Sequence, residues 1–116
     1  MNELIEKTLK GFTVNGKEIP VSFLRYDGSK KTYITYMQMD AESELYSDDE
    51  LQNYTVYYDF NIYTKEGSYK PIEKALKAVL ESVGFQWQMG RDSPDMYEDD
   101  TGYFHKTVCM SYERSN

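Results

Sequence analysis

The sequence predicts an α+β domain with a largely antiparallel β-sheet. Between residues 69 and 83, apolar side chains recur with the period of an amphipathic helix. Residues 54–64 alternate instead with the period of a strand, and other strand-like segments follow one another without helices between them. Strict alternation of strands and helices would indicate parallel βαβ units. The expected order is therefore α-β-β-β-α-β-β, in a single domain over residues 1–116.

A short amphipathic helix is expected at the start of the chain. Its apolar stripe is formed by Leu4, Ile5, Thr8, Leu9 and Phe12. Asn2 is a residue type that caps helix N-termini well, because its side chain accepts a hydrogen bond from an unpaired backbone N–H group. Gly11 is expected to end the helix in the left-handed conformation that glycine adopts readily.

A second helix, from about Tyr69 to Val83, has the most regular pattern in the sequence. Its apolar face is formed by Ile72, Ala75, Leu76, Val79, Leu80 and Val83. Ser68 is a candidate cap, and Pro71 suits the first turn because its missing N–H costs little there. Gly84 followed by an apolar residue is typical of a helix end, and we expect this helix to lie on the sheet.

Period-2 patterns predict the strands. The five expected strands are Ile19–Tyr26, Thr32–Met39, Tyr54–Thr64, Phe85–Met89 and Tyr103–Glu113. The first two flank the turn residues Asp27–Lys30, which predict a hairpin. In the third strand one face is uniformly large and apolar, and we expect it to pack under the second helix. That face consists of Val56, Tyr58, Phe60 and Ile62.

The net charge of −7 belongs to one internal segment. The chain has 20 acids and 13 bases, yet no base occurs between Lys31 and Lys65. The seven acids in that interval are Asp40, Glu42, Glu44, Asp48, Asp49, Glu50 and Asp59. An acidic chain with a pI near 4.7 lacks the basic face that a protein needs to grip nucleic-acid phosphates.

Residues 40–53 are expected to form a solvated acidic connection between two long strands. A buried element with so many carboxylates would need bases nearby, and the sequence supplies none. The charges of this connection allow two roles in an assembly. They repel DNA phosphates along a channel, or they meet a basic patch on the next subunit.

No motif of catalysis or cofactor binding is present, so we predict a protein that is not an enzyme and that needs no cofactor or metal. His105 and Cys109 stand four apart on an expected strand, about 13 Å from each other, which is too far for a nucleophile and its base. A second acidic cluster comprises Asp92, Asp95, Glu98, Asp99 and Asp100. Its spacing does not match a calcium-binding loop, which favours a solvated turn.

The location of the protein is predicted from two features of the sequence. No apolar run approaches the ~18 residues that cross a bilayer. The first residues are acidic rather than basic and lack a long apolar stretch, unlike a secretory signal. We therefore expect synthesis in the cytoplasm and no association with a membrane.

Tyrosine is unusually frequent, with 12 residues, four of them in the segment 54–64. Two interpretations remain open. The rings pack against one another across strands of a half-exposed sheet. Alternatively, they form a protein interface, where tyrosine is enriched because its ring buries area while its hydroxyl still finds a partner.

The sequence resembles small neck proteins of long-tailed bacteriophages and prophages, namely the tail terminator or tail-completion family. The likeness covers roughly residues 19–113. It is carried by the segment 45–50 leading into Tyr54–Lys65, by the helix Ile72–Val83 with its Gly84-Phe85 ending, and by Asp95–Lys106. These segments occur in the same order in that family, which has no catalytic residues to compare.

The resemblance implies an α+β subunit that assembles with copies of itself, commonly into a ring of six, at the head-proximal end of the tail. The implied partners are the tail tube protein and a head-completion protein, with DNA only as passing cargo. The implied location is the host cytoplasm during assembly and then the virion. Candidate interface residues are Tyr46, Asp48, Asp49, Glu50, Tyr57, Tyr63 and Tyr97.

Two other function classes are consistent with the sequence. A small acidic cytoplasmic adaptor or inhibitor would use the acidic segment to mimic nucleic acid. A metal-dependent enzyme would use the second acidic cluster. The oligomeric state separates the first of these from a ring-forming protein, and a metal-dependent change in melting temperature tests the second.

Overall fold

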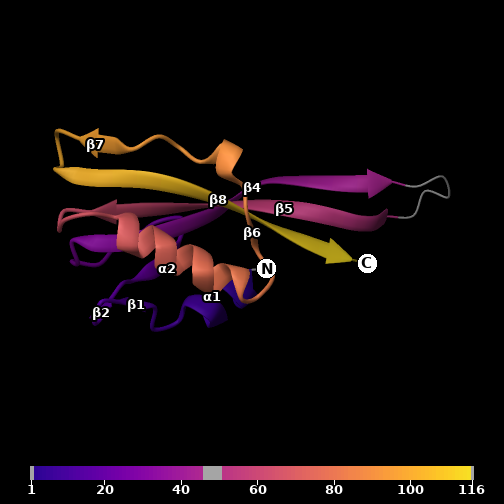
Figure 1. Cartoon of the computed structure of the whole chain (residues 1–116), viewed down its shortest axis with the longest axis horizontal. Coiled ribbons are helices and arrows are strands. Elements are labelled where there is room, and N and C mark those ends of the chain that lie inside the picture. The colour runs from indigo at the N-terminus through magenta and orange to yellow at the C-terminus, as the bar shows by residue number, and fades with distance from the viewer. Residues whose placement is uncertain (1, 46–50, 116) are drawn as a thin grey trace.

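Long strands and two helices organise the described part of the chain (Figure 1). The computed structural model describes the backbone of residues 2–45 and 51–115 and the side chains of residues 2–39 and 55–113. Its elements are α1 (Asn2–Leu9), β1 (Thr13–Val14), β2 (Lys17–Glu18), β3 (Val21–Phe23), β4 (Thr32–Leu45), β5 (Leu51–Thr64), α2 (Lys70–Glu81), β6 (Gln86–Trp87), the 3₁₀ turn η1 (Met89–Arg91), β7 (Met96–Glu98) and β8 (Tyr103–Ser115).

The main sheet has the order β3-β4-β5-β8-β6. β7 also pairs with β8, at residues 103–105, whereas β6 pairs with it at residues 110–111. Among the described residues every pair in this sheet is antiparallel except β3 with β4. The predicted α+β class with a largely antiparallel sheet and a helix packed on one face is therefore confirmed. The short pair β1–β2 forms a separate sheet near α1.

The predicted hairpin between residues 19–26 and 32–39 is wrong. The first strand is only Val21–Phe23, and it runs parallel to β4 beside Ile34–Tyr36. Leu24 has a left-handed φ of +66°, and the Arg25 N–H donates to the Phe23 carbonyl at 2.8 Å, so the chain turns out of the sheet at this point. Residues 24–31 then form a loop that returns to the beginning of β4.

The predicted acidic connection over residues 40–53 is also largely strand. β4 continues to Leu45 and β5 begins at Leu51, and the two pair along this length with register shifts at Gln38/Asp40 and Glu44/Leu45. Residues 46–50 lie outside the described part of the chain.

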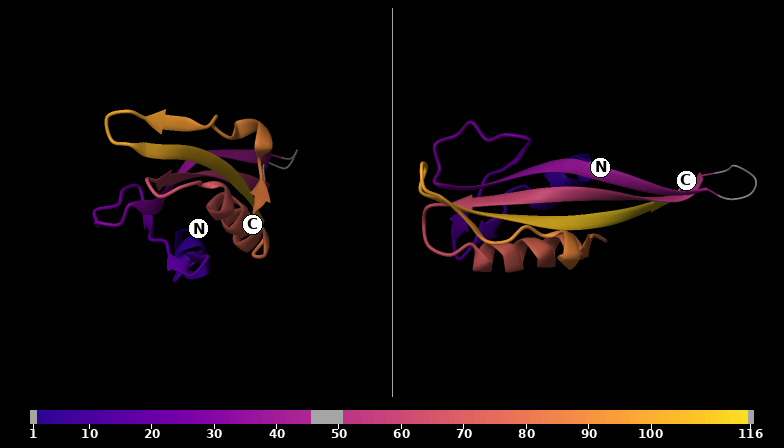
Figure 2. Two further views of the ribbon diagram at one scale, coloured as in Figure 1. Left: turned by 60° about the vertical axis from the view of Figure 1, so that its left-hand side comes forward. Right: turned by 90° about the horizontal axis from the view of Figure 1, so that it is seen from above.

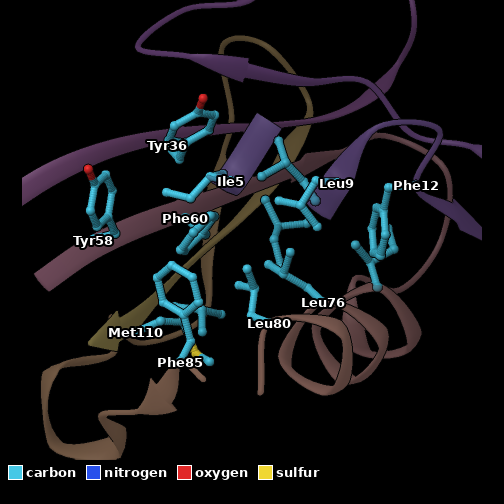
Figure 3. Close-up of a cluster of buried hydrophobic side chains, with 14 of the residues drawn as sticks. Ile5, Leu9, Phe12, Tyr36, Tyr58, Phe60, Leu76, Leu80, Phe85 and Met110 are labelled. Atoms are coloured by element: carbon cyan, nitrogen blue, oxygen red, sulfur yellow. The ribbon is translucent and has the colours of Figure 1, made fainter. Parts of the chain in front are cut away.

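The core lies between the helices and one face of the sheet (Figure 3). The predicted packing of α2 against β5 is confirmed, because Ile72, Leu76 and Leu80 are buried in one cluster with the inner-face residues of β5. α1 contributes Ile5 and Leu9 to the same cluster. The inner-face residues of β5 in this cluster are Val56, Tyr58, Phe60 and Ile62.

The predicted ending of α2 at Gly84 is confirmed, whereas at its start Tyr69 rather than Ser68 occupies the N-cap position and makes no side-chain cap bond. The Lys70 N–H donates to the Ser68 hydroxyl at 3.1 Å. At the other end Gly84 has a φ of +105°, and the N–H groups of Gly84 and Phe85 donate to the carbonyls of Glu81 and Leu80, both at 3.1 Å. This pair of bonds is the Schellman arrangement, which satisfies carbonyls that the helix leaves unpaired.

The ends of α1 differ partly from the prediction. Asn2 is the first helical residue, and its side chain accepts a hydrogen bond from the Tyr58 hydroxyl at 3.0 Å. The amide therefore ties the start of α1 to β5. Gly11 has the expected left-handed φ, at +71°.

The predicted strand Phe85–Met89 is reduced to Gln86–Trp87. Just before η1 the Gln88 N–H donates to the Cys109 carbonyl at 2.9 Å, and after η1 the Ser93 N–H donates to the Thr107 carbonyl at 3.0 Å. The chain therefore runs along the edge of β8 on both sides of η1. Further along the same edge, β7 pairs antiparallel with β8 from Met96 onward. One edge of the sheet is thus protected along residues 103–111.

The described molecule is elongated, with extents of 53 × 27 × 24 Å. β4, β5 and β8 extend together beyond α2, as Figure 2 shows. We call this part the distal ribbon, defined as residues 42–45, 51–55 and 113–115. Neither helix in the described part of the chain has both the length and the apolar character needed to cross a membrane.

Candidate assembly surfaces

The outer edge of β4 is open beyond Tyr36 in the described part of the chain. β3 covers β4 only at Ile34–Tyr36, and the Leu24 N–H makes the last bond on this side, to the Tyr36 carbonyl at 2.9 Å. The described chain then turns away from the sheet. Residues 37–45 consequently present backbone groups with no neighbouring strand on that side among the described residues.

Large apolar side chains are exposed at the point where this edge opens. They are Phe23 (42% exposed), Leu24 (56%), Met37 (36%) and Met39 (53%), which we call the edge patch. Open strand edges pair readily with another strand, and grouped exposed apolar residues mark interaction surfaces. Phe23 is in register with the inward-facing Tyr36, whereas Met37 is in register with Asp59 on the outer face, so the edge patch flanks the open edge of β4 on both faces of the sheet. A strand added at this edge would meet apolar side chains on both of its sides.

A buried hydroxyl without a partner lies next to the edge patch. Tyr36 is 1% exposed, and its hydroxyl has no hydrogen-bond partner in the described part of the chain. Its ring lies 5.5 Å from that of Phe23, and it lines a cavity of about 490 Å³ between α1 and β3. A buried hydroxyl normally forms a hydrogen bond, so Tyr36 is an unsatisfied polar group in the described part of the chain.

The outer face of the sheet carries a row of stacked rings. Tyr33, Tyr63 and His105 stand opposite one another in the register of β4, β5 and β8. Tyr33 and Tyr63 stack at 4.9 Å between centroids, and Tyr63 and His105 at 4.2 Å. Tyr26 extends the row by stacking on Tyr33 at 4.7 Å, and Tyr103 packs edge-on against Tyr33 and Tyr63.

These rings are half-buried by one another. Burial raises the pKa of both Tyr33 and Tyr63. It lowers the pKa of His105, although Glu98 at 3.8 Å acts in the opposite direction. The described contacts of the Tyr63 ring are thus cross-strand packing contacts with Tyr33, Tyr103 and His105.

His105 is expected to make the folded state less stable as the pH falls below 7. Its pKa in the folded protein lies below the ordinary value of 6.5, so the unfolded chain binds more protons in that interval. Stability is then fully present above pH 6.5 and declines as the pH falls through the lower folded value. His105→Phe keeps a ring against Tyr63 and removes this decline.

Urea unfolding of both proteins between about pH 7.5 and 5.5 checks this expectation. The free energy of unfolding of the variant should depend less steeply on pH than that of the wild type. Equal slopes would show that His105 titrates alike in the folded and unfolded chains.

The candidate interface residues do not form one site among the described residues. Tyr57 and Tyr63 share the outer face of β5 but stand six positions apart, which puts about 20 Å of strand between them. Tyr57 is covered by the Arg91 guanidinium, 4.0 Å from the ring centre. Tyr97 lies on β7, is 54% exposed and packs on Phe104 at 4.9 Å. Tyr46, Asp48, Asp49 and Glu50 lie outside the described residues.

The second acidic cluster is divided among separate structural contacts. Asp92 accepts hydrogen bonds from the Trp87 indole N–H at 2.8 Å and from the Cys109 backbone N–H at 2.9 Å. Glu98 accepts one from the Thr101 hydroxyl at 2.9 Å. Among the side chains that the structure describes, those of residues 2–39 and 55–113, no three histidine, cysteine or acidic groups gather closely enough to hold a metal ion.

Asp95 pairs with a buried tyrosine rather than with its acidic neighbours. It accepts a hydrogen bond from the Tyr69 hydroxyl, and Lys106 Nζ lies 3.6 Å from its carboxylate. The hydrogen bond lowers the pKa of Asp95, and burial together with the same bond raises that of Tyr69 to about 12. The pair ties the start of α2 to the segment before β7.

Cys109 is buried and protonated. Burial in the sheet, together with the neighbouring Asp59 carboxylate, raises the pKa of its thiol to about 11. The thiolate that a nucleophile requires is therefore scarce at neutral pH. The geometry gives Cys109 a packing role on the outer face of β8.

The edge patch was not predicted from the sequence. Phe23 and Leu24 were assigned to a hairpin strand, and Met37 and Met39 to its partner, so all four were expected to have paired neighbours. The sequence does show apolar residues, Phe23 and Leu24, shortly before the polar turn residues 27–30. This pattern does not indicate at which residue a strand leaves a sheet, so it does not predict which side chains are exposed.

Comparison with known proteins finds no matching family model and no matching curated protein. The likeness to tail terminators therefore rests on the residues quoted above.

Proposed function

We propose that the protein is a structural subunit that binds copies of itself and forms a ring. From the resemblance, we assign it to the head-proximal end of a bacteriophage or prophage tail, as a tail terminator or tail-completion subunit. The observation that carries this proposal is the open edge of β4 with the edge patch beside it. Such a surface leaves strand pairing and apolar burial incomplete in a lone subunit.

Two further features support an assembling protein. The Tyr36 hydroxyl is buried beside Phe23 without a hydrogen-bond partner in the described part of the chain, which leaves an unsatisfied polar group at this edge of the lone subunit. The distal ribbon extends past the helices and so places strand surface away from the core (Figure 2). A ring requires two different surfaces on each subunit, and an elongated shape separates such surfaces well.

In this role the subunit would stop tail-tube polymerisation and present a surface to the head-completion protein. Its partners are other copies of the chain, the tail tube protein and the head-completion protein, and DNA passes through without being held. It acts in the host cytoplasm during assembly and then in the virion. It uses no cofactor and catalyses no reaction.

Native mass spectrometry of the purified protein tests the proposal. We expect one closed oligomer, of six copies, in the micromolar range. Met39→Lys places a charge in the edge patch and should shift the population to monomers. Ala78→Lys, on the exposed side of α2, is the matched control and should leave the oligomer intact.

A monomer at every concentration, with no binding to isolated tail tubes, would overturn the proposal. That result would favour the alternative of a small acidic binding module. An oligomer that survives Met39→Lys unchanged would show that the edge patch is not the interface.

A further inference from the structure

The edge of the sheet opposite to the edge patch also exposes large apolar side chains. Trp87 on β6 is 39% exposed, and Met89 in η1 is 68% exposed, the highest value among the exposed large apolar residues described. We call Trp87 and Met89 the β6 patch. β6 is the last strand of the sheet on this side in the described part of the chain. Both edges of the sheet thus carry exposed apolar groups, which mark interaction surfaces.

The two patches lie at the same level along the strands. One row of the sheet begins at Gln38 on β4, between the two methionines of the edge patch, and ends at Trp87 on β6. Its members, in order across the strands, are Gln38, Tyr58, Met110 and Trp87. Subunits that stand side by side without a shift along the strands would therefore bring the edge patch of one against the β6 patch of the next.

The strand directions at the two edges suit an antiparallel contact. β4 and β8 each pair antiparallel with β5, and β6 pairs antiparallel with β8. β6 consequently runs opposite to β4 within one subunit. In a ring whose axis runs along the strands, neighbouring subunits keep the same strand direction, so β4 of one subunit would lie antiparallel to β6 of the next.

The backbone groups at this level also face outward on both edges. The Tyr36 carbonyl accepts its bond from Leu24 on the outer side of β4, and because backbone groups alternate along a strand, those of Gln38 face the same side. On β6 the Gln88 N–H donates inward to Cys109, so the neighbouring Trp87 groups face away from β8. An edge-to-edge contact would set the Gln38 backbone opposite that of Trp87.

We infer that the edge patch of one subunit packs on the β6 patch of the next copy, with β4 of the first antiparallel to β6 of the second. This inference rests on the proposed self-assembly and names its second surface. The contact joins two different edges, and such a heterologous contact generates a ring when the rotation closes. Contact between two edge patches would instead be isologous, would stop at two copies and would leave the β6 patch exposed.

A disulfide cross-link tests the contact. With Gln38 opposite Trp87 in an antiparallel pair, Met39 of one subunit stands beside Gln86 of the next. Within one subunit these positions are three strand spacings apart, about 14 Å, which is too far for a disulfide. Mild oxidation of the Met39→Cys, Gln86→Cys chain should give a ladder of covalent oligomers that ends at six copies. The one native cysteine, Cys109, is buried.

The cross-link has two kinds of control. Met39→Cys alone and Gln86→Cys alone should give no cross-linked species, because each puts a thiol on only one side of the contact. Met39→Cys with Tyr97→Cys places the second thiol on the same edge at an exposed residue of β7. Tyr97 is in register with Phe104, seven positions and about 23 Å along β8 from the residue opposite Gln86, so this chain should give no ladder.

Met89→Glu tests the same contact without a cross-link. It places a carboxylate in the β6 patch, and we expect the dissociation constant of the oligomer to rise at least about tenfold, because the charge loses its hydration in an apolar contact. Ala78→Glu is the matched control, since it adds one carboxylate at an exposed position of α2, and it should assemble like the wild type. Sedimentation equilibrium measures assembly, and thermal melting verifies that each variant is folded.

The outcomes separate the two proposals. An oligomeric protein whose Met39→Cys, Gln86→Cys chain gives no ladder, or whose assembly is unchanged by Met89→Glu, overturns this contact and leaves self-assembly standing. Covalent dimers from Met39→Cys alone also overturn it, because they mean that two edge patches meet. A wild type that never assembles overturns both proposals. A ladder from the double variant alone, together with weaker assembly of Met89→Glu, supports the contact.

Discussion

Leu76→Ala is expected to lower the free energy of unfolding by about 2–5 kcal/mol. Leu76 is fully buried and lies in the middle of the α2 stripe, in the same cluster as the inner face of β5. Removing its branched end loses apolar burial and leaves a cavity that the rigid sheet cannot close. A domain of this size has a total stability of about 5–15 kcal/mol, so the loss is a large share of it.

Urea unfolding and the melting temperature measure this effect. Lys74→Ala is the control on the same helix, because Lys74 is exposed, and it should change stability by less than about 0.5 kcal/mol. Equal melting temperatures for Leu76→Ala and the wild type would mean that the apolar stripe of α2 does not pack against the sheet.

The elements with strong local signals were predicted well from the sequence. The α2 stripe, its Gly84 ending and the alternation in β5 each depend on residues close together in the chain, and all three are found in the structure. The ion pair between Glu73 and Lys77, at 3.3 Å, follows from the same local spacing. Where a pattern is complete within one element, the sequence suffices to predict it.

The errors concern pairing between segments. The turn residues 27–30 suit a hairpin, but Tyr26 stacks on Tyr33, and its hydroxyl accepts a hydrogen bond from the Lys30 N–H at 3.1 Å. These contacts hold the segment as a loop. β3 pairs parallel with β4 instead of antiparallel. No local pattern distinguishes these two outcomes.

The candidate site depends on the same non-local choices. The edge patch exists because β3 ends at Phe23 while β4 continues to Leu45, and this mismatch is a property of two strands together. The acids of residues 40–45 were predicted to be in a loop because no bases stand near them in sequence. In the structure that stretch is strand paired with β5.

Phe60→Ala is expected to lower the free energy of unfolding by about 3–5 kcal/mol. Phe60 is fully buried on β5, between its neighbours β4 and β8. Its ring lies 5.8 Å from that of Tyr36 and 6.4 Å from those of Tyr58 and Phe85. The substitution therefore removes the ring that connects β4 to the segment following α2, and three large neighbours lose contact area together.

Phe104→Ala is the matched control, because Phe104 is also a strand phenylalanine but is 42% exposed and packs on Tyr97 alone among the described aromatic pairs. It should cost less than about 1 kcal/mol. Denaturant unfolding of the two variants measures the difference directly. If Phe60→Ala cost no more than Phe104→Ala, the inner face of β5 could not be the centre of the core. The helices would then have to derive their stability from contacts with each other rather than from the sheet.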